Sequence, residues 1–172
     1  PAFRDTYYRD HATGGGAIQD AITHIFNAAE WLVGPIDRLA ADAANKQLDG
    51  VAVEDTVHVL ARHDGVLGCY TLNQYQSPNE LSITIVCEQG TVRFESNRNR
   101  WRWMIKPDTP WQDEPGPATD RDAPFIRQAN SFLDFLEDRS LPLCSLADGV
   151  QTLKVNLATL ASAKSQTWQS IR

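Results

Sequence analysis

The sequence predicts an α+β fold, in which an open, predominantly antiparallel β-sheet carries helices packed on one face. A helical pattern near the N-terminus is followed by a series of short alternating apolar segments and then by two further helical patterns. Helices and strands that stay in separate blocks along the chain are typical of α+β folds, and strands joined by tight turns pair antiparallel. A chain of 172 residues fits one domain, so we expect a single domain over residues 1–172.

The first helical pattern follows the triple glycine Gly14-Gly15-Gly16. Apolar residues then recur at intervals of four and three residues: Ile18, Ile22, Ile25, Ala29 and Leu32. This spacing predicts one helix over residues 14–33 that packs its apolar side on the sheet. Thr13 suits the N-cap position, and Gly34-Pro35 is a stop signal.

Several segments in the middle of the chain alternate apolar and polar residues, as half-buried strands do. They are residues 36–43, 55–62, 66–75, 81–87, 91–95 and 101–105. Turn residues separate them, for example His63-Asp64-Gly65 and Glu88-Gln89-Gly90. We therefore expect an antiparallel sheet of about five or six strands. Residues 107–120 contain four prolines, which predicts a loop.

Two helices are expected at the C-terminal end. Asp122 and Pro124 are start signals for the first, whose apolar stripe is Ile126, Ala129, Leu133 and Leu136. Ser145 and Asp148 suit a capping box for the second. Its predicted core-facing stripe is Val150, Leu153, Leu157 and Leu160.

Composition narrows the possible partners. Lys and Arg number 16 and Asp and Glu 22, a net charge of −6, so we expect no nucleic-acid partner. We see no signal peptide and no apolar run of roughly 18 residues, and therefore expect no membrane partner and a cytoplasmic protein. The dispersed cysteines and histidines predict no metal site. The chain begins at Pro1 without a methionine, so we expect a fragment or a processed form.

The first helix also carries the candidate chemistry. Asp20 and His24 are four residues apart, on the side opposite the isoleucines, and Trp31 falls on the same side. The ordinary interpretation is a solvated helix face. Trp31 is unusual on a face meant for water, and three glycines permit close approach of a ligand or another backbone. Histidine is also the side chain whose unperturbed pKa suits proton transfer near neutral pH.

The stretch from Gly14 to His24 resembles the G-G-G-x-x-x-D-x-x-x-H signature of the Gfo/Idh/MocA oxidoreductases, which include glucose–fructose oxidoreductase and inositol 2-dehydrogenase. Further stretches are similar to the family: Trp31-Leu32-Val33-Gly34, Glu54-Asp55-Thr56, the turn at residues 88–91 and the last helix at residues 147–164. The resemblance covers nearly the whole chain.

The resemblance implies a substrate-binding and oligomerisation domain, of a kind that follows an N-terminal Rossmann domain binding NAD or NADP. His24 would then be the catalytic base, taking the proton from a sugar or polyol hydroxyl, and Asp20 would bind a neighbouring hydroxyl and orient His24. A lysine from an E-K-P motif in the Rossmann domain normally completes the set. Neither that motif nor a G-x-G-x-x-G fingerprint occurs in this sequence. We therefore expect the chain alone to bind no cofactor and to be inactive.

Four further residues complete the predicted substrate-binding set. Asn27 lies one turn beyond His24, Gly15 and Gly16 allow close approach of a ligand, and Arg9 precedes the glycines. A polar loop is the alternative interpretation of Arg9. The other histidines, His58 and His63, are expected on the surface.

Two other functions stay open at this point. In the first, the chain is a non-enzymatic ligand sensor or regulator of the same fold. In the second, it is mainly an oligomerisation module. The Asp20–His24 pair favours the enzyme, because a sensor has no need of a proton acceptor. We also expect a homo-oligomer that buries the open face of the sheet, because strand residues such as Leu72, Trp101 and Trp103 are poorly suited to water. Which of these alternating residues face outward stays open at this point.

Overall fold

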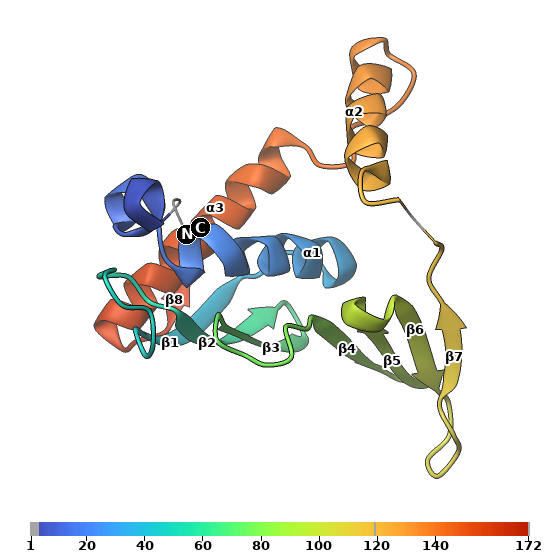
Figure 1. Ribbon diagram of the computed structural model, residues 1–172. Coiled ribbons are helices and arrows are strands. Elements are labelled where there is room, and N and C mark those ends of the chain that lie inside the picture. The colour runs from blue at the N-terminus through green and yellow to red at the C-terminus, as the bar shows by residue number, and fades with distance from the viewer. Residues whose placement is uncertain (1–3, 119, 172) are drawn as a thin grey trace. The chain divides into compact units, whose positions relative to one another are not determined.

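The computed structural model describes residues 4–118 and 120–171. The chain divides into two compact units, Pro1–Tyr75 with Cys144–Arg172, and Gln76–Leu143. Each unit contains one four-stranded antiparallel sheet, with strand orders β3-β2-β1-β8 and β4-β5-β6-β7. The α+β class with open antiparallel sheets is confirmed (Figure 1). The strands form two sheets of four rather than one sheet of five or six.

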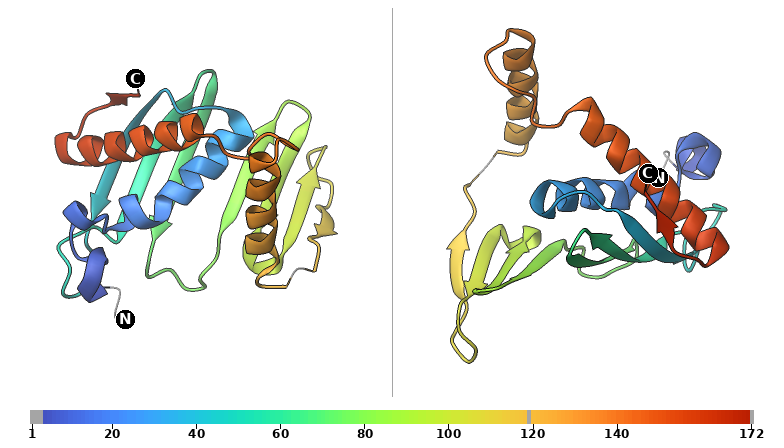
Figure 2. Two further views of the ribbon diagram at one scale, coloured as in Figure 1. Left: turned by 90° about the horizontal axis from the view of Figure 1, so that it is seen from above. Right: turned by 180° about the vertical axis from the view of Figure 1, so that it is seen from behind.

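The first unit places two helices on one face of its sheet. Its strands are β1 (Arg38–Ala44), β2 (Thr56–His63), β3 (Val66–Asn73) and β8 (Gln169–Ser170). Helices α1 (Thr23–Val33) and α3 (Leu146–Ser165) lie side by side over these strands (Figure 2). Three short helical segments precede α1: η1 (Arg4–Tyr8), η2 (His11–Thr13) and η3 (Ala17–Ile22).

The predicted first helix is correct in place but wrong at its start. Thr13 ends the short helix η2 instead of capping the long one, and Gly16 precedes η3, a π-helical segment with wide turns. The wide turns shift the helix face, because π-type bonding joins residues five apart. The fully buried row is therefore Ile18, Ile22 and Phe26, at intervals of four. The helix ends at Gly34 as predicted.

Strand alternation in the first sheet follows the sequence closely. Val57, Val59 and Ala61 of β2 face the core, as predicted. Leu72 pairs with Val57 and packs against the same core. Leu72 therefore points to the core side of the sheet and not to its open face, because paired residues of antiparallel strands point to the same side.

Helix α3 begins with the predicted capping box, but most of the side that it packs on the sheet differs from the predicted apolar stripe. Ser145 and Asp148 form the reciprocal capping bonds. Of the predicted core-facing stripe, Leu153 and Leu157 are more than half exposed. The buried residues are mostly small or polar: Thr152, Val155, Asn156, Thr159 and Ser162.

Hydrogen bonds explain this reversal. Asn156 Nδ2 donates to the carbonyl oxygen of Ile18 (2.7 Å), and the backbone N–H of Ala41 donates to Ser162 Oγ (2.9 Å). Buried polar side chains that find partners carry little cost, and small ones let the helix approach the strands closely. Val150, Leu153 and Leu157 are left on the outer side of the helix, whereas Leu160 packs partly against the core as predicted.

The second unit contains β4 (Ser82–Cys87), β5 (Gly90–Glu95), η4 (Ser96–Arg98), β6 (Arg100–Met104), β7 (Gln112–Pro115) and α2 (Ala123–Leu136). Strand β7 falls inside the predicted loop 107–120, so that prediction is wrong in part. Its pairing with β6 is supported by ion pairs from Asp113 to Arg100 (2.6 Å) and to Arg102 (3.0 Å). The four prolines favoured a loop in the sequence, but β7 lies at the edge of its sheet, where proline is tolerated.

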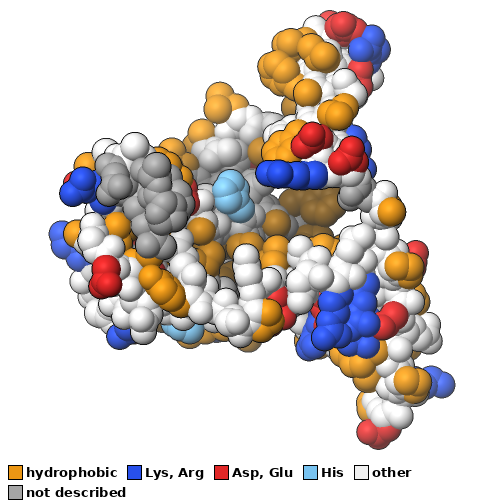
Figure 3. Space-filling view, viewed as in Figure 1, with side chains coloured by type: hydrophobic (Ala, Val, Ile, Leu, Met, Phe, Trp, Pro, Cys, Tyr) orange, Lys and Arg blue, Asp and Glu red, His pale blue; other side chains and the backbone are white. Residues whose placement is uncertain are grey.

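Helix α2 starts at Asp122 and Pro124 as predicted, but its apolar stripe is not in a core. No described residue of α2 is buried, and the hydrophobic side chains on its surface are visible in Figure 3. The exposed set includes Phe125, Ile126, Phe132, Leu133 and Leu136.

Candidate active site

The start of the Asp20-bearing segment is fixed by one glutamate. The carbonyl oxygen of Glu54 accepts a hydrogen bond from the N–H of Ala17 (2.9 Å), and its Oε1 accepts one from the N–H of Ile18 (2.8 Å). Glu54 precedes β2 and is only 7% exposed. Its carboxylate therefore satisfies a helix-start donor that otherwise has no partner within the helix.

The glycines before this segment are accounted for by packing. A Cβ on Gly15 would lie 2.2 Å from the carbonyl oxygen of Tyr8. A Cβ on Gly16 would lie 2.6 Å from Glu54 Oε1, and its φ of +99° disfavours other residues. Both glycines are buried against the protein itself. Their contact with a substrate stays a prediction.

The same contacts decide whether a nucleotide cofactor fits at the glycines. A pyrophosphate needs free N–H groups at a helix start. Here the Glu54 carboxylate already occupies that position, and its Oε2 lies 2.6 Å from His11 Nε2. A second anion would meet a negative charge, so these residues do not fit a dinucleotide phosphate.

Asp20 lies within η3 and is half-buried. Its Oδ1 accepts a hydrogen bond from the hydroxyl of Tyr7 (3.2 Å). Partial burial, followed by the hydrogen bond and charge of Asp20, raises the pKa of Tyr7 above its usual 10.0. Tyr7 therefore remains a protonated donor at neutral pH. Sequence reasoning missed it, because the two residues are thirteen positions apart and lie in different elements.

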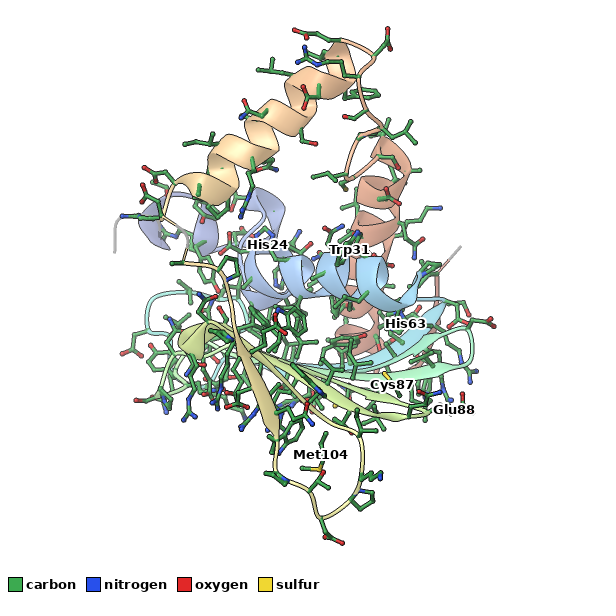
Figure 4. All side chains as sticks on the ribbon, turned by 90° about the vertical axis from the view of Figure 1, so that its right-hand side faces the viewer. His24, Trp31, His63, Cys87, Glu88 and Met104 are labelled. Atoms are coloured by element: carbon green, nitrogen blue, oxygen red, sulfur yellow. The ribbon has the colours of Figure 1, made fainter. Side chains whose placement is uncertain are left out.

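His24 follows in the first turn of α1 and is exposed to solvent. Figure 4 shows His24 and Trp31 on the side of α1 that faces away from the sheet, and the Trp31 side chain is 79% exposed. Both positions agree with the predicted face. Within residues 4–118 and 120–171, no hydrogen bond joins Asp20 and His24. The change from π-type to α-type turns between them alters the i, i+4 geometry that the sequence predicts.

The other predicted binding residues, Asn27 and Arg9, lie in different surroundings. Asn27 Nδ2 donates to Thr152 Oγ1 (3.1 Å), and Thr152 in turn donates to Glu30 Oε2 (2.9 Å). Asn27 is thus part of the contact between α1 and α3. Arg9 is exposed, between η1 and η2. Their binding roles stay predictions.

The remaining histidines differ in their surroundings. His58 lies on the outer face of β2 as predicted. His63 is buried, so its prediction as a surface residue is wrong. Its Nδ1 donates to the carbonyl oxygen of Gly34 (2.6 Å), and its Nε2 lies 2.5 Å from the hydroxyl of Tyr70. Burial, with smaller contributions from Glu30 and Cys69, raises the pKa of Tyr70 to about 12.

Metal-binding clusters and membrane spans are both lacking in the described part of the chain. Among residues 4–118 and 120–171, no group of three or more His, Cys, Asp and Glu side chains is arranged to hold a metal ion. In the same residues, no helix has the length and apolar character needed to cross a membrane.

Comparison with solved structures reveals the same fold in several oxidoreductases. An oxidoreductase domain protein from Kribbella flavida matches with a TM-score of 0.85 and 21% identity, over 97% of this chain and 53% of that one. Levoglucosan dehydrogenase, in complex with NADH and levoglucosan, matches with a TM-score of 0.83 and 20% identity. This match covers 96% of this chain and 53% of that one. The WlbA dehydrogenase from Bordetella pertussis, in complex with NADH and UDP-GlcNAcA, matches with a TM-score of 0.71 and 22% identity. This match covers 98% of this chain and 50% of that one. The chain thus spans about half the length of these relatives.

Sequence comparison assigns the family. A search among curated proteins found no match. The family model of the GFO/IDH/MocA C-terminal domain matches residues 1–93, which is more than half of the 172 residues. The matched part contains the triple glycine, Asp20, His24 and Glu54. The chain therefore belongs to the Gfo/Idh/MocA oxidoreductase family, as its C-terminal domain.

Proposed function

We propose that this chain is the substrate-binding part of an NAD(P)-dependent oxidoreductase that acts on a sugar, inositol or related polyol. The observation that carries the proposal is the arrangement of the signature residues. His24 is exposed on the side of α1 away from the sheet, directly after the segment that holds Asp20. An exposed imidazole four residues after a carboxylate that accepts a hydrogen bond from Tyr7 suits a hydroxyl-bearing substrate better than a purely structural face.

His24 accepts the proton of the reacting hydroxyl in this proposal. Neutral imidazole has one nitrogen free to accept a proton, and histidine changes charge near neutral pH. Asp20 accepts a hydrogen bond from a neighbouring hydroxyl through an oxygen that Tyr7 does not engage. The nicotinamide, when bound, supplies the hydride acceptor. Every step assigned to this chain is a hydrogen bond or a proton transfer.

The cofactor belongs to another part of the protein. The helix start at the glycines does not fit a phosphate, because the Glu54 carboxylate fills it. The similar dehydrogenases whose structures hold NADH are about twice as long as this chain. These two facts support a separate dinucleotide-binding domain, and the chain alone is expected to bind neither NAD nor NADP.

The substrate class rests on the relatives. Their structures hold levoglucosan, L-sorbose or UDP-GlcNAcA, all of which carry several hydroxyl groups. A site with one carboxylate and one imidazole recognises adjacent hydroxyls, since the carboxylate accepts from one while the imidazole accepts from the other. The coarse class is therefore a polyhydroxylated compound.

Two exposed surfaces support contacts beyond the chain. The outer side of α3 carries Leu153 and Leu157, which suits the cofactor-binding domain. The outer face of the first sheet carries Leu60 and Leu67, which suits a second copy of the chain. Contiguous exposed apolar residues usually mark protein contacts.

An activity screen of the full oxidoreductase that contains this chain tests the proposal. Oxidation of a panel of sugars and inositols is followed by the absorbance of NADH or NADPH. We expect turnover with at least one polyol and none with simple mono-alcohols. Ligand binding by the full protein without any turnover would favour the sensor instead.

A further inference from the structure

We infer that Tyr7 is a positioning residue for Asp20, holding its carboxylate in the orientation that receives a substrate hydroxyl. This inference rests on the proposed function for its role in substrate binding. It rests on the structure alone for the contact between the two side chains. Neither the composition of the chain nor the family signature points to Tyr7, which lies before the triple glycine.

The contact joins two elements that the chain does not bring together locally. Tyr7 lies in η1, Asp20 in η3, and the hydroxyl of Tyr7 donates to Asp20 Oδ1 over 3.2 Å. Tyr7 is 41% exposed, so part of its ring borders solvent. A phenol that donates to one carboxylate oxygen selects one side-chain orientation and leaves the other oxygen as the acceptor.

The backbone of Tyr7 is held in place on both sides. Its carbonyl oxygen accepts a hydrogen bond from Thr13 Oγ1 (2.5 Å). The next residue, Tyr8, is buried with Leu48 and Val53 in a small apolar cluster of its own. Gly15 presses against the backbone of both tyrosines, where any Cβ would clash. These contacts fix Tyr7 relative to the glycines that precede Asp20.

The arrangement explains why two adjacent tyrosines have opposite environments. Tyr8 points into the protein and anchors the segment, and Tyr7 points toward Asp20. Gly15 and Gly16 then connect this anchored segment to η3 with no side chains between them. The packing of the neighbouring residues therefore holds the side chains of Tyr7 and Asp20 in contact.

A titration of the chain itself tests the contact without any substrate. Tyrosines labelled with ¹³C at Cζ report each phenol separately by NMR. Partial burial and Asp20 both raise the pKa of Tyr7, so Asp20→Asn should lower its midpoint toward 10.0 while leaving the effect of burial. Tyr75, which is similarly exposed at 46%, is the internal control and should not move. An unchanged midpoint for Tyr7 in Asp20→Asn would overturn the inference.

Kinetics of the full oxidoreductase test the role in binding. Tyr7→Phe should raise KM about tenfold, the usual effect of losing one hydrogen bond to a charged group, with a smaller change in kcat. The effect should vanish in the Asp20→Asn background, because both changes remove the same contact. Additive effects, or a KM unchanged by Tyr7→Phe, would refute a positioning role. If the full protein turns over no polyol, the proposed function fails, and the titration still decides the Tyr7–Asp20 contact.

Discussion

The carboxylate of Glu54 accepts a hydrogen bond from the backbone N–H of Ile18, 2.8 Å away, at the start of the segment that leads to Asp20 and His24. The residue that introduces strand β2 thereby fixes the helix that carries the candidate chemistry. Its other oxygen holds His11. Through these two contacts, the buried Glu54 side chain connects the start of β2 with η2 and with the segment that carries Asp20.

Glu54→Ala is expected to lower the free energy of unfolding by about 2 kcal/mol, because it leaves the buried N–H of Ile18 without a partner. Glu54→Gln retains an oxygen at that position and should cost less than the alanine variant. Urea denaturation of the isolated chain measures both. Equal losses for the two variants would show that the charge, rather than the hydrogen bond to Ile18, holds the segment.

The sheet strands were predictable because their information is local. Alternation along β2 and the turn at Asp64-Gly65 are contained in neighbouring residues, and the structure reproduces both. The start of α2 at Asp122 and the capping box at Ser145 are equally local and are also confirmed, although the Asp122 side chain makes no capping hydrogen bond. The contact that holds the start of the π-type segment was not predictable, because its acceptor, Glu54, lies 36 positions after Ile18.

The buried side of α3 and the burial of His63 were mispredicted for the same reason: both depend on hydrogen-bond partners that are distant in the sequence. Asn156 and Ser162 are polar, and only the carbonyl of Ile18 and the N–H of Ala41 make their burial acceptable. His63 is buried because Gly34 and Tyr70 supply partners for both ring nitrogens. Distant partners of this kind cannot be read from spacing, so apolar periodicity predicted the wrong side of α3 at Val150, Leu153 and Leu157 and the right side only at Leu160.

The reversed packing of α3 gives a sharp ranking of mutants. Val155→Ala should cost about 2 kcal/mol of stability, because Val155 is fully buried. Leu153→Lys, at a position 56% exposed, should change stability by less than about 0.5 kcal/mol. Thermal denaturation of both variants provides the measurement, and packing through the leucine stripe would give the opposite order. In the full protein, Leu153→Lys should instead weaken contact with the cofactor-binding domain, seen as easier proteolytic separation.

Asp55 links stability to pH. It is fully buried and accepts backbone hydrogen bonds from Lys46, Gln47 and Leu48. Burial opposes ionisation, but these bonds and that of Thr56 outweigh it and lower the pKa of Asp55 below 3.8. A lowered pKa in the folded state means that the contribution is present above 3.8 and is lost as pH falls through the folded value.

Asp55→Asn should therefore destabilise the chain by about 3 kcal/mol near neutral pH, since its amide N–H₂ faces backbone donors. The difference from the parent should begin to shrink below about pH 3.8, where Asp55 takes up a proton in the unfolded chain, and should reach its minimum only below the lower pKa of the folded state. Urea denaturation as a function of pH measures this. A difference that stays constant at low pH would mean that the charge of Asp55 is not what the loop 46–48 recognises.

Association through the outer face of the first sheet is testable at Leu60. Leu60 and its pairing partner Cys69 are both exposed on the face opposite the core. A dimer burying this face should dissociate when Leu60→Lys places a charge there. Light scattering of parent and variant at matched concentration is the measurement. His58→Lys, on the same face, shows whether the effect extends along the strand, and a parent that remains monomeric at high concentration would exclude this surface.

The role of His24 is tested by its removal from the full oxidoreductase. His24→Ala should lower kcat by about 10²–10⁴-fold, the usual contribution of a general base, with only a small change in KM, because a base acts mainly in the transition state. Asp20→Asn should change both kcat and KM, since in the proposed function that carboxylate binds a neighbouring hydroxyl and helps to orient His24. His58→Ala is the matched control, because His58 is also exposed but lies on the outer face of β2. A kcat within a few-fold of the parent in His24→Ala would place the base in another residue, with the lysine of the cofactor-binding domain the next to test.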